Sequence, residues 1–258
     1  MILDDITAYR KIQLEREMSE HSPAEVKKAA EAISAPCRGF AKALKRDSIA
    51  VIAEVKKASP SKGLICPDFR PAETAVEYEK AGAAAVSCLT EEHYFMGCSA
   101  YLTAVHEKIS LPVLRKDFII DPYQIYEART IGADAVLLIA ALLDKDTLKE
   151  YNDIAASLGL DTLAEAHNER ELDNILEAGC RTVGINNRDL TTFNVTLDTT
   201  EKLAGMIPQG YTIVSESGIK TNEDIRRVRA CGADAVLIGE TLMRSGDIAG
   251  CMNTLTQI

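Results

Sequence analysis

The sequence lacks several features that would define whole classes of protein. It has no excess of basic residues, because 29 Lys and Arg stand against 39 Asp and Glu, a formal net charge of −10. Nucleic-acid backbones select basic surfaces, so we expect no nucleic-acid partner. The longest apolar run covers residues 135–143. That run is far too short to cross a bilayer, so we expect no membrane partner.

Signatures of targeting and of metal binding are also missing. Residues 1–10 hold no basic segment, apolar segment or small-residue cleavage site, so we expect no targeting signal. The seven cysteines are widely spaced and form no CxxC pair, which argues against a disulfide framework and a zinc site. The four histidines show no ligand spacing. These absences predict a cytoplasmic protein with reduced thiols and no bound metal.

What the sequence does contain is a regular alternation that begins near residue 48. Short apolar or β-branched runs predict eight strands, at 49–55, 84–89, 112–115, 135–139, 162–164, 182–185, 212–214 and 235–238. Amphipathic stretches predict helices between them, among others at 71–81, 122–131, 144–158, 168–178 and 222–230. Eight alternations in about 200 residues indicate an α/β fold, the (β/α)8 TIM barrel. The alternative is an open doubly wound sheet, but no GxGxxG follows the first strand.

An internal repeat supports the barrel. Residues 81–86, 131–136 and 231–236 are near copies, and 178–180 is a weaker one. Each contains a glycine that we expect to end a helix in the left-handed conformation before a buried strand. The glycines fall at 82, 132, 179 and 232, so the period is close to two βα units, a quarter of the barrel.

Residues 1–47 do not follow this alternation. Their apolar positions predict amphipathic helices packed on the barrel, with Ile2, Ile6, Tyr9, Ile12 and Leu14 in the first and Val26, Ala29 and Ile33 in the second. No linker rich in Gly, Ser or Pro follows them. We therefore expect one domain over residues 1–258, with 1–47 as an N-terminal helical extension and 48–258 as the barrel.

Barrel active sites lie at the carboxyl ends of the strands, and the first and third strands end in charged residues. Glu54 and Lys56 share one face of the first strand because side chains alternate with a period of two. On the third strand Lys116 shares its face with Leu114 and Phe118, opposite Arg115 and Asp117. Such apolar neighbours are expected to lower the pKa of Lys116 and to suit it to proton transfer. A salt bridge at a strand end is the alternative.

The fifth and sixth strands also end in polar residues. Glu165 lies where the fifth strand gives way to a helix. Its alternative role is purely structural, since Asn168 is a typical N-cap and a glutamate there favours the helix dipole. Asn186 follows the sixth strand and is a candidate to orient a substrate, whereas Asn187 and Asp189 are also typical of turns.

Two late segments have the features of a phosphate site. Residues 214–219 and 237–242 end the seventh and eighth strands, where barrels often bind phosphate. Gly218 and Gly239 would allow close approach of the backbone, and Ser59 to Gly63 would add hydroxyl and ammonium donors.

Five ordered segments carry a family resemblance: 53–63, 114–119, 164–169, 184–190 and 215–219. In these segments, and over essentially its whole length, the chain resembles the indole-3-glycerol-phosphate synthase family of tryptophan biosynthesis. The resemblance implies that 1-(2-carboxyphenylamino)-1-deoxyribulose 5-phosphate loses carbon dioxide and water to give indole-3-glycerol phosphate. It implies no metal and no organic cofactor.

The resemblance also implies catalytic roles. Lys116 would be the general acid that assists loss of the hydroxyl during ring closure. Glu165 would be the base of the later dehydration, with Asn186 placing it and the substrate. Lys56 would contact the substrate carboxylate and take part in the dehydration, while Glu54 would position and balance the lysines.

The other implied residues hold the substrate. Ser217 would bind a substrate hydroxyl and count among the catalytic residues, and Arg188 would order the site by pairing with an acid. Phe118 would wall the anthranilate ring. The remaining contacts would be Glu216 in the pocket lining and Ser59, Gly218 and Gly239 at the phosphate.

Some positions depart from the family pattern. Ala58 replaces a residue that is often basic, Glu240 stands where a small hydroxyl residue is common, and the 93–98 loop is unusual. Because the side chain of Glu240 does not offer a hydroxyl donor, we expect backbone amides to donate to the phosphate at this position. The alternatives are a related phosphate-binding barrel, such as phosphoribosylanthranilate isomerase, and a catalytically dead binding barrel. We expect a monofunctional monomer, with association with other tryptophan-pathway enzymes left open.

Overall fold

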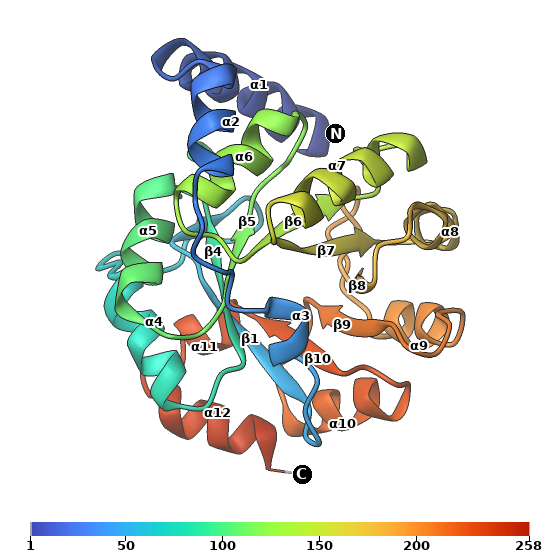
Figure 1. Ribbon diagram of the computed structural model, residues 1–258. Helices are drawn as coiled ribbons and strands as arrows, with labels where there is room; N and C mark the ends of the chain where they lie inside the picture. Colours follow the sequence, from blue (N-terminus) through green and yellow to red (C-terminus); the bar gives the residue numbers. More distant parts are fainter. Residues whose placement is uncertain (1, 258) are drawn as a thin grey trace.

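The computed structural model describes residues 2–257. Within them, eight parallel strands close into a barrel in which each strand pairs with its neighbours in the chain and the last pairs with the first (Figure 1). The predicted (β/α)8 barrel is confirmed. The strands are β1 (Ala50–Val55), β4 (Ala85–Leu89), β5 (Val113–Lys116), β6 (Ala135–Ile139), β7 (Asp161–Ala166), β8 (Thr182–Asn186), β9 (Thr212–Glu216) and β10 (Ala235–Ile238).

Helices surround the barrel, and their apolar faces pack on the outward-facing side chains of the strands. They are α4 (Pro71–Lys80), α5 (Ser99–Lys108), α6 (Pro122–Thr130), α7 (Lys145–Ser157), α8 (Glu169–Ala178), α9 (Asp198–Ala204), α10 (Asn222–Ala230), α11 (Glu240–Met243) and α12 (Ile248–Thr256). The five helices expected from amphipathic spacing all form. None of the helices described is long and apolar enough to cross a membrane.

A short hairpin was not predicted. β2 (Ala58–Ser59) and β3 (Gly63–Leu64) pair antiparallel directly after β1. Two-residue strands are too short to produce a periodic pattern. The hairpin lies in the segment expected to help bind phosphate, and it folds Ser59 into a buried position.

The N-terminal extension packs on one side of the barrel as α1 (Ile2–Glu20) and α2 (Pro23–Glu31), and α2 lies against α6 (Figure 1). The predicted apolar face is partly wrong. Tyr9 and Ile12 are 44% and 64% exposed, and Ala29 on α2 is also exposed. The residues of α1 that are buried are Ile6, Arg10, Gln13 and Leu14. Two of these are polar. Arg10 pairs with Asp117 of the barrel and with Glu17 of its own helix, while the Gln13 amide donates to Glu17 and its oxygen accepts from the backbone N–H of Glu92.

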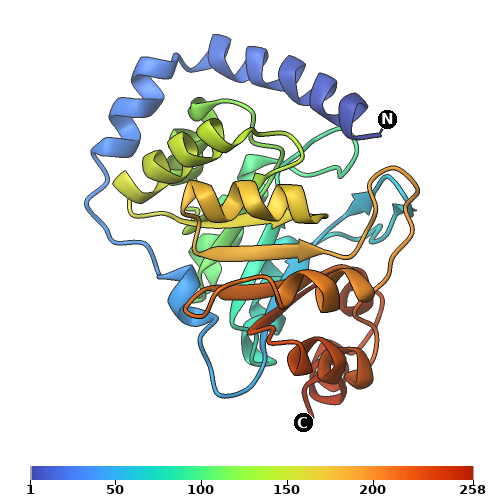
Figure 2. The same cartoon turned by 90° about the vertical axis from the view of Figure 1, so that its right-hand side faces the viewer.

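The end of the barrel at the strands' amino termini is closed by the chain itself. The segment before β1 forms α3 (Phe40–Ala43), at the end opposite to the strands' carboxyl termini (Figure 2). Phe40 and Leu44 are fully buried and pack on inward-facing residues of the strands. Truncating a buried phenylalanine typically costs about 3–5 kcal/mol, so this plug is a substantial part of the core.

The repeated segments have equivalent structures. The glycines at 82, 132, 179 and 232 all have positive φ, between 82° and 96°, directly after a helix. Two of the three near copies, those at 131–136 and 231–236, also carry an aspartate. Asp134 accepts a hydrogen bond from the Val113 backbone N–H at 2.9 Å, and Asp234 accepts one from Ile213 at 2.8 Å. Each carboxylate thus fixes the start of the strand next to its own.

Candidate active site

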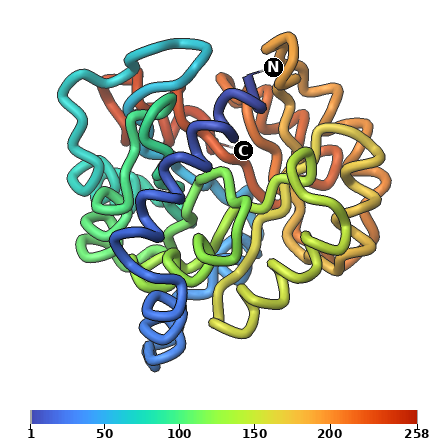
Figure 3. The backbone as a smooth tube through the Cα atoms, turned by 90° about the horizontal axis from the view of Figure 1, so that it is seen from above, coloured from blue at the N-terminus to red at the C-terminus, as the bar shows by residue number. Residues whose placement is uncertain are grey.

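A cavity of about 550 Å³ opens at the carboxyl ends of the strands. The structure places around it all twelve residues expected in the site: Glu54, Lys56, Ser59, Lys116, Phe118, Glu165, Asn186, Arg188, Glu216, Ser217, Gly218 and Gly239. Residues from β1, β5, β7, β8, β9 and β10 therefore meet in one space. The N-terminal end of α1 adds Ile2, Leu3 and Ile6 to its wall, and Figure 3 shows this helix lying across the barrel with its N-terminal end toward the loops of the C-terminal half.

Lys116, the last residue of β5, occupies the centre of the charged cluster. Its Nζ lies 2.8 Å from Glu165 Oε2 and 2.8 Å from Glu216 Oε2. The three side chains are 15%, 4% and 2% exposed. Arg115 and Asp117 point the other way, as the alternation predicts. Lys116 therefore bridges two carboxylates that come from strands on other sides of the barrel.

This bridge corrects one prediction. Burial alone would lower the pKa of Lys116, but the nearby carboxylates of Glu165 and Glu216 outweigh burial and raise it. The lysine is therefore a charged acid at rest, not a partly deprotonated amine. The expectation of a lowered pKa considered only Leu114 and Phe118, which are neighbours in sequence.

The pKa values of Glu165 and Glu216 are shifted in opposite directions. Burial raises the pKa of both, but the positive charges of Lys116 and His167 outweigh it at Glu165 and lower its pKa. At Glu216 burial and the negative charge of Glu165 prevail, and they raise its pKa to about 7. The site thus holds an ionised carboxylate, a charged amine and a carboxyl group that retains its proton into the neutral range.

A second pair of opposite charges lies on β1. Lys56 Nζ is 2.8 Å from Glu54 Oε1, and the Ser87 hydroxyl donates to Glu54 Oε2 at 3.4 Å. Glu54 is buried, and a side-chain carbon added at Gly239 would clash with its carboxylate. The expected shared face of Glu54 and Lys56 is confirmed. A glycine at 239 is needed for the packing of this glutamate.

Asn187 has a larger structural role than that of a turn residue. Its side-chain amide is buried and donates to Ser215 Oγ and to the carbonyls of Glu216 and Ser217, all at 3.0 Å. Its oxygen accepts from Thr200. It therefore fixes the end of β9, where Ser217 has a positive φ of 65°. Asp189 does cap a turn, since it accepts from the backbone of Thr191 and Thr192.

One end of the cavity is rich in cations. Lys62, Lys220 and Arg244 line the cavity beside Gly218 and Gly239. Glu240 lies among them, with Oε1 at 3.9 Å from Lys62 and 3.2 Å from Arg244. The glutamate therefore pairs with cations at the cavity edge. Arg188 also lines the cavity, but the ion pair expected for it is not found among residues 2–257.

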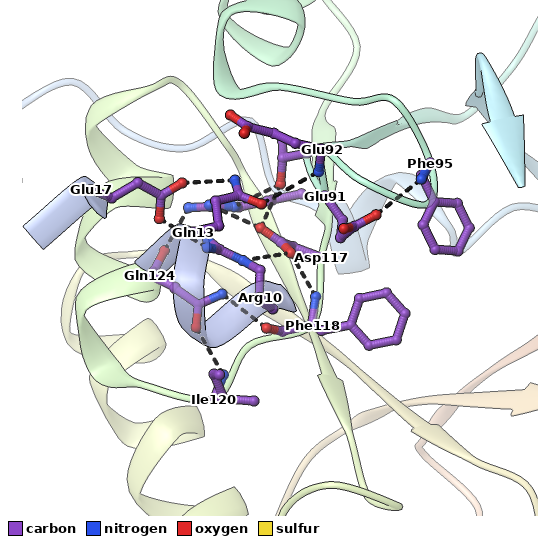
Figure 4. A network of polar contacts seen from close by, with 12 residues as sticks. Arg10, Gln13, Glu17, Glu91, Glu92, Phe95, Asp117, Phe118, Ile120 and Gln124 are labelled. Atoms are coloured by element: carbon purple, nitrogen blue, oxygen red, sulfur yellow. Dashed lines mark hydrogen bonds and ion pairs between the residues drawn. The ribbon is translucent and has the colours of Figure 1, made fainter. Parts of the chain in front are cut away.

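A buried network ties α1 to the strand that carries Lys116 (Figure 4). Arg10 is fully buried, with Nε 3.0 Å from Asp117 Oδ1 and Nη1 2.9 Å from Glu17 Oε2. Asp117 also accepts from Thr90 at 2.7 Å and from the Phe118 backbone at 2.8 Å. Arg10 and Asp117 thus hold the chain on the carboxyl side of Lys116.

Comparison with known proteins decides the family. The family model for indole-3-glycerol phosphate synthase matches residues 3–255. An indole-3-glycerol phosphate synthase of Ruminiclostridium cellulolyticum is 54% identical over 248 residues, which are 96% of this chain and 95% of that protein. One of Endomicrobium trichonymphae is 50% identical, with 96% and 97% covered. This chain belongs to the indole-3-glycerol phosphate synthase family.

Solved structures of low sequence identity add evidence on the fold of this synthase-family chain. A tryptophan synthase α-subunit from Pyrococcus furiosus has a TM-score of 0.62 at 14% identity and covers 83% of this chain and 99% of its own. A 3-hexulose-6-phosphate synthase from Salmonella typhimurium has a TM-score of 0.62 at 13% identity, with 81% and 97% covered. These likenesses show the barrel alone.

Three residues contact the lining of the synthase-family cavity although the sequence pattern does not indicate it: Asn187, Arg10 and His167. Asn187 is also typical of a turn, and Arg10 lies one turn after Ile6 on a face predicted to be apolar. His167, whose Nε2 lies 3.4 Å from Glu165 Oε1, was considered only as a metal ligand. Its alternation with Glu165, two residues earlier on the strand, was the available signal.

Arg10→Met is expected to destabilise the protein by about 3–5 kcal/mol, because it removes one partner of a buried ion pair and leaves Asp117 and Glu17 undercompensated. Arg16→Ala is a matched control, since it removes an exposed ion pair between the same helix and Glu92 in the loop after β4. That change should cost at most about 1 kcal/mol. Urea unfolding of the three proteins measures both. Equal losses in the two variants would contradict the role of the buried pair.

Glu216 is expected to make stability fall with pH. Its folded pKa of about 7 lies above its ordinary value of 4.5, so between these values the folded state holds a proton that the unfolded state releases. The contribution is complete below pH 4.5 and is lost as pH rises through about 7. In urea unfolding across this interval, the free energy of unfolding should fall in the wild type relative to Glu216→Gln. A difference that rises or stays constant would contradict this.

Proposed function

We propose that this protein is an indole-3-glycerol-phosphate synthase, a carboxy-lyase of tryptophan biosynthesis. Its substrate would be 1-(2-carboxyphenylamino)-1-deoxyribulose 5-phosphate, which loses carbon dioxide and water as the indole ring closes. The observation that carries the proposal is the position of Lys116 in the cavity, with Nζ 2.8 Å from both Glu165 and Glu216. The chain that forms this cavity matches the model of the synthase family over residues 3–255. The reaction needs a proton donor and a proton acceptor side by side in a desolvated pocket.

Lys116 is the general acid of this proposal. It is fully charged at rest because its carboxylate neighbours raise its pKa. During ring closure the aromatic carbon that carries the carboxylate bonds to the ketone carbon of the substrate, the carbonyl π bond breaks, and Lys116 donates its proton to that oxygen. Carbon dioxide then leaves from the aromatic carbon, and the new hydroxyl leaves as water in the later dehydration. The neighbouring carboxylates stabilise the charged amine before the transfer and attract a proton back afterwards.

Glu165 is the base of the dehydration. It is ionised because Lys116 and His167 lower its pKa against the effect of burial. Asn186 lines the same wall and places both the carboxylate and the substrate. Lys56, balanced by Glu54 at 2.8 Å, supports the substrate carboxylate and takes part in this step.

Substrate binding is assigned to the rest of the cavity. Phe118 would wall the anthranilate ring together with Phe95, whose ring centre lies 5.9 Å from its own. Ser217 would bind a substrate hydroxyl, and Glu216 lines the same pocket. The phosphate would bind at Ser59, Gly218 and Gly239, with Arg188 among the cations that offset its charge.

The proposal also covers location and partners. The seven cysteines are free thiols, which supports the reducing cytoplasm as the location. The net charge of −10 supports the absence of a nucleic-acid partner. We place the protein as a monomer that acts alone or beside other enzymes of tryptophan synthesis. Sedimentation velocity measures its mass, and a dimer would contradict the monomer.

The test is formation of indole product from the carboxyphenylamino-deoxyribulose phosphate, followed by fluorescence with purified protein and EDTA. Turnover in EDTA is the expected result. Absence of turnover with retained substrate binding would contradict the activity and point to a binding-only barrel. In that case Glu240 and the 93–98 loop are the first positions to exchange for the usual family residues.

A further inference from the structure

His167 stands between two carboxylates at the end of β7. Its Nε2 lies 3.4 Å from Glu165 Oε1, and its Nδ1 lies 3.0 Å from Glu171 Oε2 in the first turn of α8. The backbone N–H of His167 donates to the same Glu171 oxygen at 2.8 Å. The imidazole is only 11% exposed. Glu171 is fixed in turn by Asn168, the N-cap of α8.

This arrangement determines where the imidazole carries its protons. An ionised carboxylate only accepts hydrogen bonds, so Nδ1 carries a proton toward Glu171. Nε2 is buried and has no hydrogen-bond partner in the described chain, and the nearest carboxylate oxygen belongs to Glu165. A lone pair on Nε2 would repel that oxygen, whereas a second proton would be attracted by it.

The charged groups around the ring favour the second proton. They are Glu165 on the same strand, Glu171 on α8 and Glu216 on β9, with Lys116 of β5 on the far oxygen of Glu165. Burial opposes a charged imidazole, but the carboxylates outweigh burial and raise the pKa of His167. The ring therefore keeps its second proton to a higher pH than an unperturbed histidine does.

We propose that His167 is a positioning residue that acts through Glu165: a proton on its Nε2 holds Oε1, as Lys116 holds Oε2. The carboxylate of Glu165 is thus held from both sides while it serves as the base. This role of His167 rests on the proposed function. The plane of the carboxylate is then fixed, and loss of the Nε2 proton releases it. A base displaced by about 1 Å can lose about a hundredfold in rate.

Two substitutions separate this role from a purely structural one. In His167→Gln the side-chain amide reaches the position of Nε2 and can donate to Glu165. In His167→Asn it reaches only the position of Nδ1 and can donate to Glu171. We expect His167→Asn to lower kcat about tenfold or more, with KM within about twofold, and His167→Gln to retain most of kcat. Equal values in the two variants, or a larger loss in His167→Gln, would overturn the proposal.

The pH profile gives a second readout. Wild-type kcat should fall on the alkaline side as the Nε2 proton is lost, and this limb should be absent in His167→Gln, whose amide does not titrate. An unchanged alkaline limb in that variant would overturn the proposal. Thermal unfolding of each variant at the assay pH shows that the compared proteins are folded.

A third measurement does not depend on turnover. Nitrogen NMR of the four histidine rings, assigned with His167→Gln, gives the pKa of His167 in the whole protein. It should fall in Glu165→Gln and in Glu171→Gln, because each removes one facing carboxylate. A pKa unchanged in Glu165→Gln overturns the contact itself. If wild-type protein shows no turnover, the proposed function fails, and this titration alone decides the role of His167.

Discussion

Lys116→Ala is expected to lower kcat by about a thousandfold or more and to leave the fold intact. A positioned general acid contributes about 10²–10⁴ in rate, and within residues 2–257 no other ammonium group is recorded in an ion pair with Glu165 or Glu216. The fold should survive because Glu216 already tends to hold a proton, so that the two carboxylates need not both be ionised. Steady-state fluorescence assays and urea unfolding measure the two effects.

Lys149→Ala provides the control for this variant. Lys149 is exposed on α7, and among residues 2–257 its ion-pair partner is Asp153, at 2.6 Å and four residues later on the same helix. Its removal should leave kcat unchanged and cost at most about 0.5 kcal/mol of stability. Normal turnover in Lys116→Ala would remove the central claim of the mechanism.

Glu165→Gln is expected to lower kcat by about 10²–10⁴ while substrate binding is retained. The amide has nearly the shape of the carboxylate, so the cavity wall is preserved, but it does not accept a proton at neutral pH. Lys116 keeps Glu216 as an ionic partner. Calorimetric titration with substrate should give a dissociation constant close to that of the wild type. Loss of binding, or a kcat within a few fold of the wild type, would contradict the assignment of Glu165 as the base.

The barrel could be predicted largely because its signals are local. The predicted strand at 235–238 matches β10 residue for residue, and that at 182–185 is one residue short of β8. Buried parallel strands form short apolar runs bounded by glycine and helix caps, so a window of a few residues identifies them. The inward direction of Lys116 follows from the same two-residue alternation.

The electrostatics of the site could not be predicted in this way. The pKa of Lys116 depends on Glu165 and Glu216, which lie 49 and 100 residues further along the chain. Arg10 likewise finds Asp117 across 107 residues. Short-range patterns show which residues are polar, but the closure of the barrel decides which polar groups meet. The predicted apolar face of α1 is partly wrong for this reason: Ile6 and Leu14 are buried as expected, but Tyr9 and Ile12 are exposed.

The plug formed by Phe40 and Leu44 closes the end of the barrel opposite to the cavity. Both side chains are fully buried, so this end offers no passage along the axis. Within residues 2–257 the cavity is lined by the N-terminal end of α1, by the carboxyl ends of the strands and by the loops that follow them. The product must leave by the route through which the substrate enters. A bound product molecule therefore blocks the next substrate, and inhibition by indole-3-glycerol phosphate should be purely competitive.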